Sequence, residues 1–333
     1  MIFSRNDIAI DLGTVNTIVR NQDEILFNEP TCIALDSRNR ERIICLGSKA
    51  KQMIGRTPLE IEVINPLLNG AISDFETTKL FMHALIESAK TSSLSPRVGI
   101  SIPQNLTQVE RHSLHEATMF AGAKEVFLIE DPFSASVGAG IDISKAKARM
   151  VIDAGGGLVE VSIISLGGLV VSTFTKEAGD FIDYAIVDYC KYNKNIGISK
   201  EMAESIKRKI NLFGESEIIN VGAKNLINGM PIHFELNLNE LKSVLISGLY
   251  KIKDSVLLAI DKSSPDMAAD LIEEGAILTG GMALIDGTRE FLEEELNMKI
   301  TLSNDPLLDI SKGASLIMQD YESYSLEWGG GID

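Results

Sequence analysis

Two copies of one short motif, an apolar strand that ends in Asp and runs into a glycine turn, lie far apart in this chain. The first copy spans residues 8–14 and the second spans residues 150–157. The apolar strand places each Asp at a strand end, and the glycines let backbone N–H groups approach an anion closely. Two such turns predict a chain built from two facing halves, with phosphate as the anion.

Asp11 and Asp153 are the acidic residues of these two motifs. A carboxylate beside phosphate is repulsive unless a divalent cation lies between them, and Mg²⁺ commonly binds one or two carboxylates together with water and phosphate oxygens. We therefore interpret the two Asp residues together as a clamp for an Mg²⁺-nucleotide. Either copy taken alone is more typical of an ordinary Asp-Gly turn, and it is the pair of copies that favours the clamp.

Each turn is followed by a second apolar stretch, at residues 17–19 and 159–164, so each copy is predicted to be a β-hairpin. Dinucleotide-binding folds and P-loop proteins instead place phosphate at the N-terminus of a helix that directly follows the strand. Neither GxxxxGK[ST] nor a complete GxGxxG occurs, because Glu160 stands where the third glycine would be. The sequence thus argues against both of those folds.

Composition narrows the class of protein further. A length of 333 residues allows two domains, and 45% hydrophobic with 23% charged residues is typical of a soluble globular chain. The net charge of −16 argues against a nucleic-acid partner. The three cysteines show no CxxC spacing and no leader or membrane span is apparent, so we expect a reducing, cytoplasmic location.

Hydrophobic periodicity predicts an alternation of strands and helices along the chain. Thr107 and Glu110 predict a capping box at the start of a helix that ends at Gly122. The small residues of 133–140 are expected to permit close packing between two domains. Strands are predicted at 98–102, 126–129 and 276–279, a β-rich insert at 218–236, and further helices at 76–90, 180–192, 200–210 and 239–261. In the last helix the predicted core residues are Leu241, Val244, Leu245, Ile252, Val256 and Ile260.

Both turns, and a third glycine turn at residues 278–284, occur in the order and spacing of the actin-like ATPase superfamily. Four further stretches, at 27–30, 54–58, 128–132 and 164–168, resemble the MreB family of bacterial actins. The similarity covers nearly the whole chain.

This resemblance implies an α/β, actin-like fold with two ribonuclease-H-like domains. Each domain is expected to carry a five-stranded sheet and a smaller subdomain, with a nucleotide cleft for ATP or ADP and Mg²⁺ between the domains. The boundaries that the resemblance implies are 1–30, 66–144 and 315–333 for domain IA, 31–65 for subdomain IB, 145–180 and 246–314 for domain IIA, and 181–245 for subdomain IIB.

The resemblance also implies a role for each site residue. Asp11 and Asp153 would hold the water shell of Mg²⁺. The phosphates would be wrapped by Gly13, Thr14, Val15, Asn16, Gly155, Gly156 and Gly157. The adenosine would lie against the turn of Gly280, Gly281 and Met282, where Met282 replaces the usual third glycine. Glu204 and Lys207 match positions that contact ribose and base, although by themselves they are typical of a surface i, i+3 salt bridge.

Two positions depart from the residues that support hydrolysis in the family. Asp131 stands where the family has a water-positioning Glu, and Leu158 stands where it usually has Thr. A leucine side chain cannot hydrogen-bond an attacking water. We therefore expect ATP binding with weak or slow ATP hydrolysis. Asp131 is also a good N-cap for the helix that follows.

The resemblance implies a cytoskeletal protomer that assembles head to tail into filaments for cell shape or motility. Sister actin-like filaments are a further implied partner, as is a peripheral contact at the inner face of the cell membrane. The family's membrane loop corresponds to residues 91–95, where only Leu94 is apolar. The alternative is a phosphoryl-transfer enzyme of the same superfamily, similar to a sugar kinase or an exopolyphosphatase.

Overall fold

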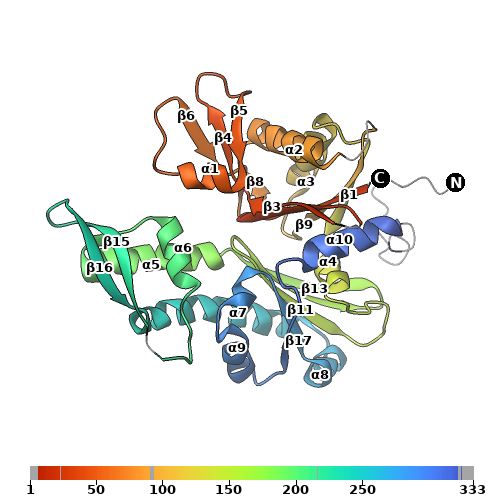
Figure 1. Cartoon of the computed structure of the whole chain (residues 1–333). Coiled ribbons are helices and arrows are strands. Elements are labelled where there is room, and N and C mark those ends of the chain that lie inside the picture. The colour runs from red at the N-terminus through yellow and green to blue at the C-terminus, as the bar shows by residue number, and fades with distance from the viewer. Residues whose placement is uncertain (1–6, 23, 91–93, 216, 322–323, 325–333) are drawn as a thin grey trace. The chain divides into compact units, whose positions relative to one another are not determined.

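The computed structural model describes residues 7–22, 24–90, 94–215, 217–321 and 324. The first residues of the 91–95 loop and most of the segment after residue 321 therefore lie outside the described part. The chain divides into two units, one made of residues 1–146, 165–169 and 308–333 and the other of residues 147–164 and 170–307. Figure 1 shows the elements of both units.

The first unit is built on a five-stranded sheet with the strand order β10-β9-β1-β2-β3. Its central strand β1 (Asp7–Leu12) pairs antiparallel with β2 (Asn16–Arg20) and parallel with β9 (Arg97–Ile102). The outer strands are β3 (Ile25–Pro30) and β10 (Glu125–Glu130). The first predicted hairpin is thus confirmed as the centre of a sheet.

The second unit repeats this arrangement with the order β13-β12-β11-β17-β18. Here β11 (Arg149–Ala154) pairs antiparallel with β12 (Val159–Ser165) and parallel with β17 (Ala276–Thr279). The outer strands are β13 (Gly168–Thr175) and β18 (Ile300–Leu302). Each copy of the Asp-glycine motif therefore occupies the same place in its own five-stranded sheet, as the sequence predicts.

Helices of the first unit follow the predicted pattern where the local signals are strong. Thr107 and Glu110 form the predicted capping box, although the helix ends before Gly122. The helices outside the smaller part of this unit are α2 (Phe75–Ala89), α3 (Gln108–Phe120), α4 (Asp131–Gly138) and α10 (Asp309–Gln319). A smaller part of this unit consists of β4 (Ile33–Asp36), β5 (Ile43–Leu46), α1 (Gly47–Met53) and β6 (Ile61–Ile64). Its three strands form a sheet with the order β5-β4-β6. A hairpin of β7 (Leu67–Leu68) and β8 (Ala71–Ile72) follows.

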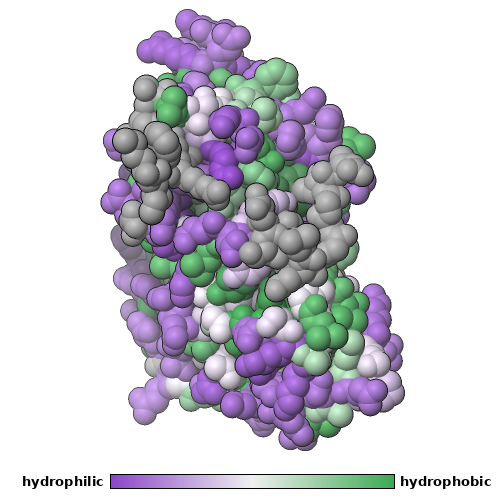
Figure 2. All heavy atoms as spheres, turned by 90° about the vertical axis from the view of Figure 1, so that its right-hand side faces the viewer, coloured by the Kyte–Doolittle hydropathy of each residue, from purple (hydrophilic) through white to green (hydrophobic). Residues whose placement is uncertain are grey.

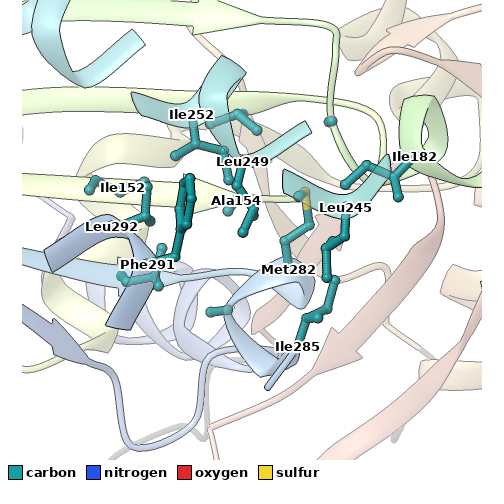
Figure 3. Close-up of a cluster of buried hydrophobic side chains, with 14 of the residues drawn as sticks. Ile152, Ala154, Ile182, Leu245, Leu249, Ile252, Met282, Ile285, Phe291 and Leu292 are labelled. Atoms are coloured by element: carbon teal, nitrogen blue, oxygen red, sulfur yellow. The ribbon is translucent and has the colours of Figure 1, made fainter. Parts of the chain in front are cut away.

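The second unit buries its largest apolar cluster between its sheet and helices α7 and α9, where Ile152, Leu249 and Leu292 lie together (Figure 3). The helices are α5 (Gly179–Lys194), α6 (Lys200–Lys207), α7 (Lys242–Lys262), α8 (Pro265–Glu274) and α9 (Thr288–Leu296), with 3-10 turns η1 (Leu238–Leu241) and η2 (Gly281–Leu284). A separate sheet has the order β14-β15-β16, from β14 (Ile196–Gly197), β15 (Ile218–Asn225) and β16 (Pro231–Asn237).

The predicted helix over 239–261 is two elements, because η1 ends at Leu241 before α7 begins. Four of its six predicted core residues are buried, whereas Val244 and Ile260 are partly buried and pack against the same core. The domain boundaries stay a prediction, although the ranges 31–65 and 181–245 each contain one of the two three-stranded sheets.

Hydrophilic residues cover much of the face in Figure 2, with smaller hydrophobic patches between them. Among the described residues, every helix is too short or too polar to cross a membrane.

Candidate functional site

The first glycine turn joins β1 to β2 in the first unit. Asp11 lies next to the end of β1, opposite Ile18 of β2 and Ser101 of β9. A β carbon on Gly13 would lie 2.6 Å from the carbonyl oxygen of Asn16, closer than real side chains approach. Glycine is therefore required at this position by the shape of the turn itself.

Three successive carbonyl oxygens of this turn accept hydrogen bonds from the body of the first unit. The Gly13 oxygen accepts from the Thr31 hydroxyl at 2.6 Å, the Thr14 oxygen from Asn65 Nδ2 at 2.8 Å, and the Val15 oxygen from the Thr31 amide at 3.0 Å. Because the described peptide bonds are trans, the C=O and the N–H of one peptide group point in opposite directions within its plane. The N–H groups that follow these carbonyls consequently point away from Thr31 and Asn65, as an anion-binding nest requires.

The side chain of Thr14 points into the protein. Its hydroxyl accepts a hydrogen bond from the Gly70 amide at 2.8 Å, and the residue is buried. The Thr14 hydroxyl therefore has a hydrogen-bond partner within its own unit.

The second turn, between β11 and β12, repeats this geometry in the second unit. Asp153 lies opposite Glu160 of β12 and Thr279 of β17. A β carbon on Gly155 would lie 2.8 Å from the carbonyl oxygen of Leu158, which also accepts a hydrogen bond from the Gly155 amide at 3.0 Å. Leu158 thus holds the place that Asn16 holds in the first turn.

Helix α5 begins against the second turn. The Gly155 oxygen accepts from the Gly179 amide at 3.2 Å, and the Gly156 oxygen accepts from the Asp180 amide at 2.7 Å. By the same peptide geometry, the amides of Gly156 and Gly157 point away from α5. This contact satisfies two of the amides that every helix N-terminus leaves without an intrahelical partner. The sequence reasoning missed it, because nothing in the local pattern connects Gly179 with the turn.

Lys207 lies beside the start of α5 and is buried, with 7% of its surface exposed. Its Nζ lies 2.8 Å from Asp183 Oδ1 and donates to the Gly179 carbonyl oxygen at 2.8 Å. Burial raises the pKa of the Asp183 carboxyl to about 6, and the positive charge of Lys207 opposes this rise. The interpretation of Glu204 and Lys207 as a surface salt bridge is wrong, because Glu204 pairs with Arg208 and Lys207 is buried with Asp183.

The third glycine turn lies directly beside Asp153. Gly280 has a φ of 86°, and a β carbon on it would lie 2.5 Å from Asp153 Oδ1. Gly281 begins η2, and Met282 is buried in the apolar core next to Leu245 and Ile285 (Figure 3). The Met282 side chain is therefore a core residue, and only its backbone remains for a ligand.

Asp131 is the first residue of α4, directly after β10. The N-cap of this helix is Glu130, whose side chain makes no capping hydrogen bond. The alternative in which Asp131 itself is the N-cap is therefore wrong by one position. Its role toward water stays a prediction.

The structure thus gathers Asp11 with residues 13–16 in the first unit, and Asp153 with residues 155–157, Gly280 and Lys207 in the second. Within the described part of the chain, no three His, Cys, Asp or Glu side chains form a group that could hold a metal ion. A single carboxylate per turn fits Mg²⁺ only if water and phosphate oxygens complete its coordination. The donors present therefore fit a metal-nucleotide and do not form a metal site of their own.

A model of the MreB/Mbl protein family matches residues 5–325. The cell shape-determining protein MreB of Escherichia coli K12 is 38% identical over 324 residues, which are 94% of this chain and 93% of that protein. The cell shape-determining protein Mbl of Bacillus subtilis 168 is 34% identical over 327 residues, covering 96% and 98%.

Solved structures agree with these relatives. MreB5 of Spiroplasma citri bound to AMPPNP has a TM-score of 0.89 and 27% identity, and the match covers 96% of this chain and 98% of that one. The MamK double helical filament has a TM-score of 0.78 at 17% identity, covering 94% and 99%, and this likeness concerns the fold.

Proposed function

Because the chain belongs to the MreB/Mbl protein family, we propose that it is an ATP-binding bacterial actin homologue that polymerises into cytoskeletal filaments for cell shape or motility. Two relatives are named cell shape-determining proteins, and MreB5 of Spiroplasma citri binds AMPPNP and ADP. The location that follows is the cytoplasm, at the inner face of the cell membrane.

One observation carries the nucleotide part of the proposal. In both turns the carbonyl groups are bound by the rest of their own unit, so the amides that follow them point away and are oriented for phosphate oxygens. Residues 13–16 and 155–157 then bind the phosphates, and the backbone of 280–282 binds the adenosine. Glu204 is assigned to the ribose on the resemblance alone.

Asp11 and Asp153 hold Mg²⁺ through its water shell in this proposal. When bound, Mg²⁺ supplies the positive charge that offsets repulsion between carboxylates and phosphate. The requirement for glycine at position 280 supports this assignment, because any larger residue there would displace the Asp153 carboxylate.

ATP hydrolysis is weak in this proposal. The Asp131 side chain is one methylene shorter than the Glu of the family, and Leu158 offers no hydrogen bond to water. A misplacement of about 1 Å costs on the order of 10²-fold in rate. Binding uses other groups and persists.

Assembly is head to tail in this proposal, since one heterologous interface that does not close into a ring generates an open filament. Sister actin-like filaments and a peripheral membrane contact are further proposed partners. Leu94 is exposed, with 71% of its surface accessible, but it is the one apolar residue of 91–95, so the membrane contact has less support than polymerisation.

The proposal is tested by pelleting the purified chain over a range of concentrations with ATP and Mg²⁺, followed by negative-stain electron microscopy of the pellet. A critical concentration and visible filaments support it. A protein that stays monomeric and turns over ATP only when a sugar or polyphosphate acceptor is added contradicts it and supports the phosphoryl-transfer alternative. Gly155→Ala is the matched variant, since it should weaken phosphate binding on the order of 10²-fold while changing a single residue of the turn.

A further inference from the structure

We propose that Lys207 positions the second glycine turn, residues 155–157, and that its amino group does not contact the base. Together with Asp183, Lys207 fixes the start of α5. The start of α5 in turn sets the direction of the amides in residues 155–157. This inference rests on the proposed function, because it assigns a role within the same nucleotide site. It departs from the assignment to ribose and base that the resemblance implies for Lys207.

The first step is the contact between α5 and the turn. The amides of Gly179 and Asp180 donate to the carbonyl oxygens of Gly155 and Gly156. Whatever moves the start of α5 therefore rotates these two peptide planes and turns the amides on their other edges away from a bound phosphate.

The second step is the position of Gly179 between the turn and Lys207. A β carbon on Gly179 would lie 3.2 Å from the α carbon of Gly156 and 3.2 Å from the Lys207 amino group. The Gly179 carbonyl accepts a hydrogen bond from that amino group at 2.8 Å. Lys207 thus holds Gly179, one of the two residues of α5 whose amides bind the turn of residues 155–157.

The third step is that the Lys207 amino group is already occupied. It pairs with Asp183 at 2.8 Å, and both side chains are nearly inaccessible, with 9% and 2% of their surfaces exposed. Breaking a buried pair leaves an uncompensated charge, which is strongly unfavourable. An amino group held in this way does not turn toward a purine.

The same helix holds α5 at a second point. Lys200, the first residue of α6, pairs with Asp180 at 2.8 Å, just as Lys207, the last residue of α6, pairs with Asp183. Both acidic residues belong to the first turns of α5. The two ion pairs therefore fix α6 against the end of α5 that contacts the phosphate turn.

The two roles of Lys207 predict different results for nucleotides that differ in the base. A base contact, when lost, changes the preference for ATP over GTP. A loss of positioning weakens the binding of ATP and of GTP by the same factor, because it acts on the phosphates that both nucleotides share. It also loosens the α5 amides in protein without nucleotide, where a base contact has no effect.

The test compares Lys207→Met with the exposed control Lys191→Met, which removes the same charge from α5 far from the turn. Amide hydrogen exchange of the unliganded protein is measured over residues 178–181, and affinities for ATP and GTP are measured with Mg²⁺. We expect about tenfold faster exchange and about tenfold weaker binding of both nucleotides in Lys207→Met, on the order expected for a displaced binding group, with neither change in the control. Unchanged exchange in Lys207→Met overturns the inference, whether or not the ATP-to-GTP ratio changes, because a lost contact to ribose or base leaves the unliganded protein as it was.

A second variant keeps the test decisive if Lys207→Met fails to fold. Asp183→Asn combined with Lys207→Met removes both buried charges at nearly constant volume, which is often tolerated. Exchange at 178–181 should remain fast in this double variant, because the donor to the Gly179 carbonyl is still missing. Exchange at the parent rate would show that Lys207 does not position α5. If the parent itself binds neither nucleotide, the proposed function fails while the exchange result still decides the role of Lys207.

Discussion

Gly138 of α4 lies against the backbone of Asp309 in α10, so closely that a β carbon on Gly138 would be 1.8 Å from the Asp309 carbonyl oxygen. The contact is reciprocal, since a β carbon on Gly313 would be 1.8 Å from the carbonyl oxygen of Ser134. The small residues of α4 do permit close packing, as the sequence suggests, but their partner is a helix of the same unit. The contact fixes α4, whose first residue is Asp131.

Gly313→Ala should destabilise the first unit because the added methyl group meets backbone atoms of Ser134 and Gly138 in α4. Overpacking of this kind costs about 1–3 kcal/mol in the free energy of unfolding. Urea unfolding followed by circular dichroism measures the change. Gly222→Ala is the control, because a β carbon there has no atom within 4 Å. Equal stability of the two variants would mean that α4 and α10 can separate without cost.

Gly13→Ala and Gly155→Ala should weaken ATP binding by the same physical cause. Each β carbon would meet the carbonyl oxygen three residues later, at 2.6 Å and 2.8 Å, so each turn must open. Displacement of the phosphate-binding amides by about 1 Å should lower affinity on the order of 10²-fold. Titration with a fluorescent ATP analogue measures it, with Gly168→Ala as a glycine outside both turns. Full affinity in either variant contradicts the role of that turn.

The parts of the fold that sequence reasoning predicted correctly depend on local signals. The two hairpins follow from apolar strands that flank Asp-glycine turns, and the capping box of α3 follows from Thr107 and Glu110. The sequence reasoning missed helices α1, α8, α9 and α10, and it expected only strands and turns where α1 lies. α9 alternates acidic residues with few apolar ones, so its pattern alone does not distinguish a helix from a solvated loop.

The candidate site was predicted only in part, for a related reason. Lys207 and Glu204 are spaced as surface partners, yet burial against Asp183 decides which carboxylate Lys207 pairs with. That choice depends on the packing of α6 against α5, which no local pattern encodes. Met282 likewise appears in a glycine turn that the resemblance assigns to adenosine, whereas its side chain fills the core.

Asp131→Glu combined with Leu158→Thr should raise the rate of ATP hydrolysis. The longer carboxylate and the new hydroxyl restore the groups that position water in the resemblance, and each such group contributes on the order of 10²-fold or more. Phosphate release under single-turnover conditions measures the rate, and ATP affinity should stay unchanged. Leu158→Val is the control, since it changes size without adding a hydrogen-bonding group. No increase over that control would show that these two positions do not limit hydrolysis.

The Asp183 carboxyl should make stability depend on pH in a direction opposite to that of an ordinary surface carboxylate. Burial raises its folded pKa from 3.8 to about 6. The folded state therefore binds the proton more tightly than the unfolded state, and the contribution of this group to stability is complete below about pH 4 and is lost as the pH rises through about 6. Measured against Asp183→Asn, the parent should lose up to a few kcal/mol of unfolding free energy across this window.

Asp142→Asn provides a comparison of opposite sign. Hydrogen bonds from the Ser144 hydroxyl, and from Lys145, lower the pKa of the Asp142 carboxyl, so its contribution is present above its unfolded pKa and is lost as the pH falls. Urea unfolding of the parent and both variants, at steps between about pH 2 and pH 7, gives the two differences, because the window of Asp142 lies below about pH 4 and that of Asp183 lies above it. If the difference between the parent and Asp183→Asn is flat over this range, Asp183 titrates in the folded protein as it does in the unfolded chain, and its pairing with Lys207 then fully offsets the cost of burying both charges.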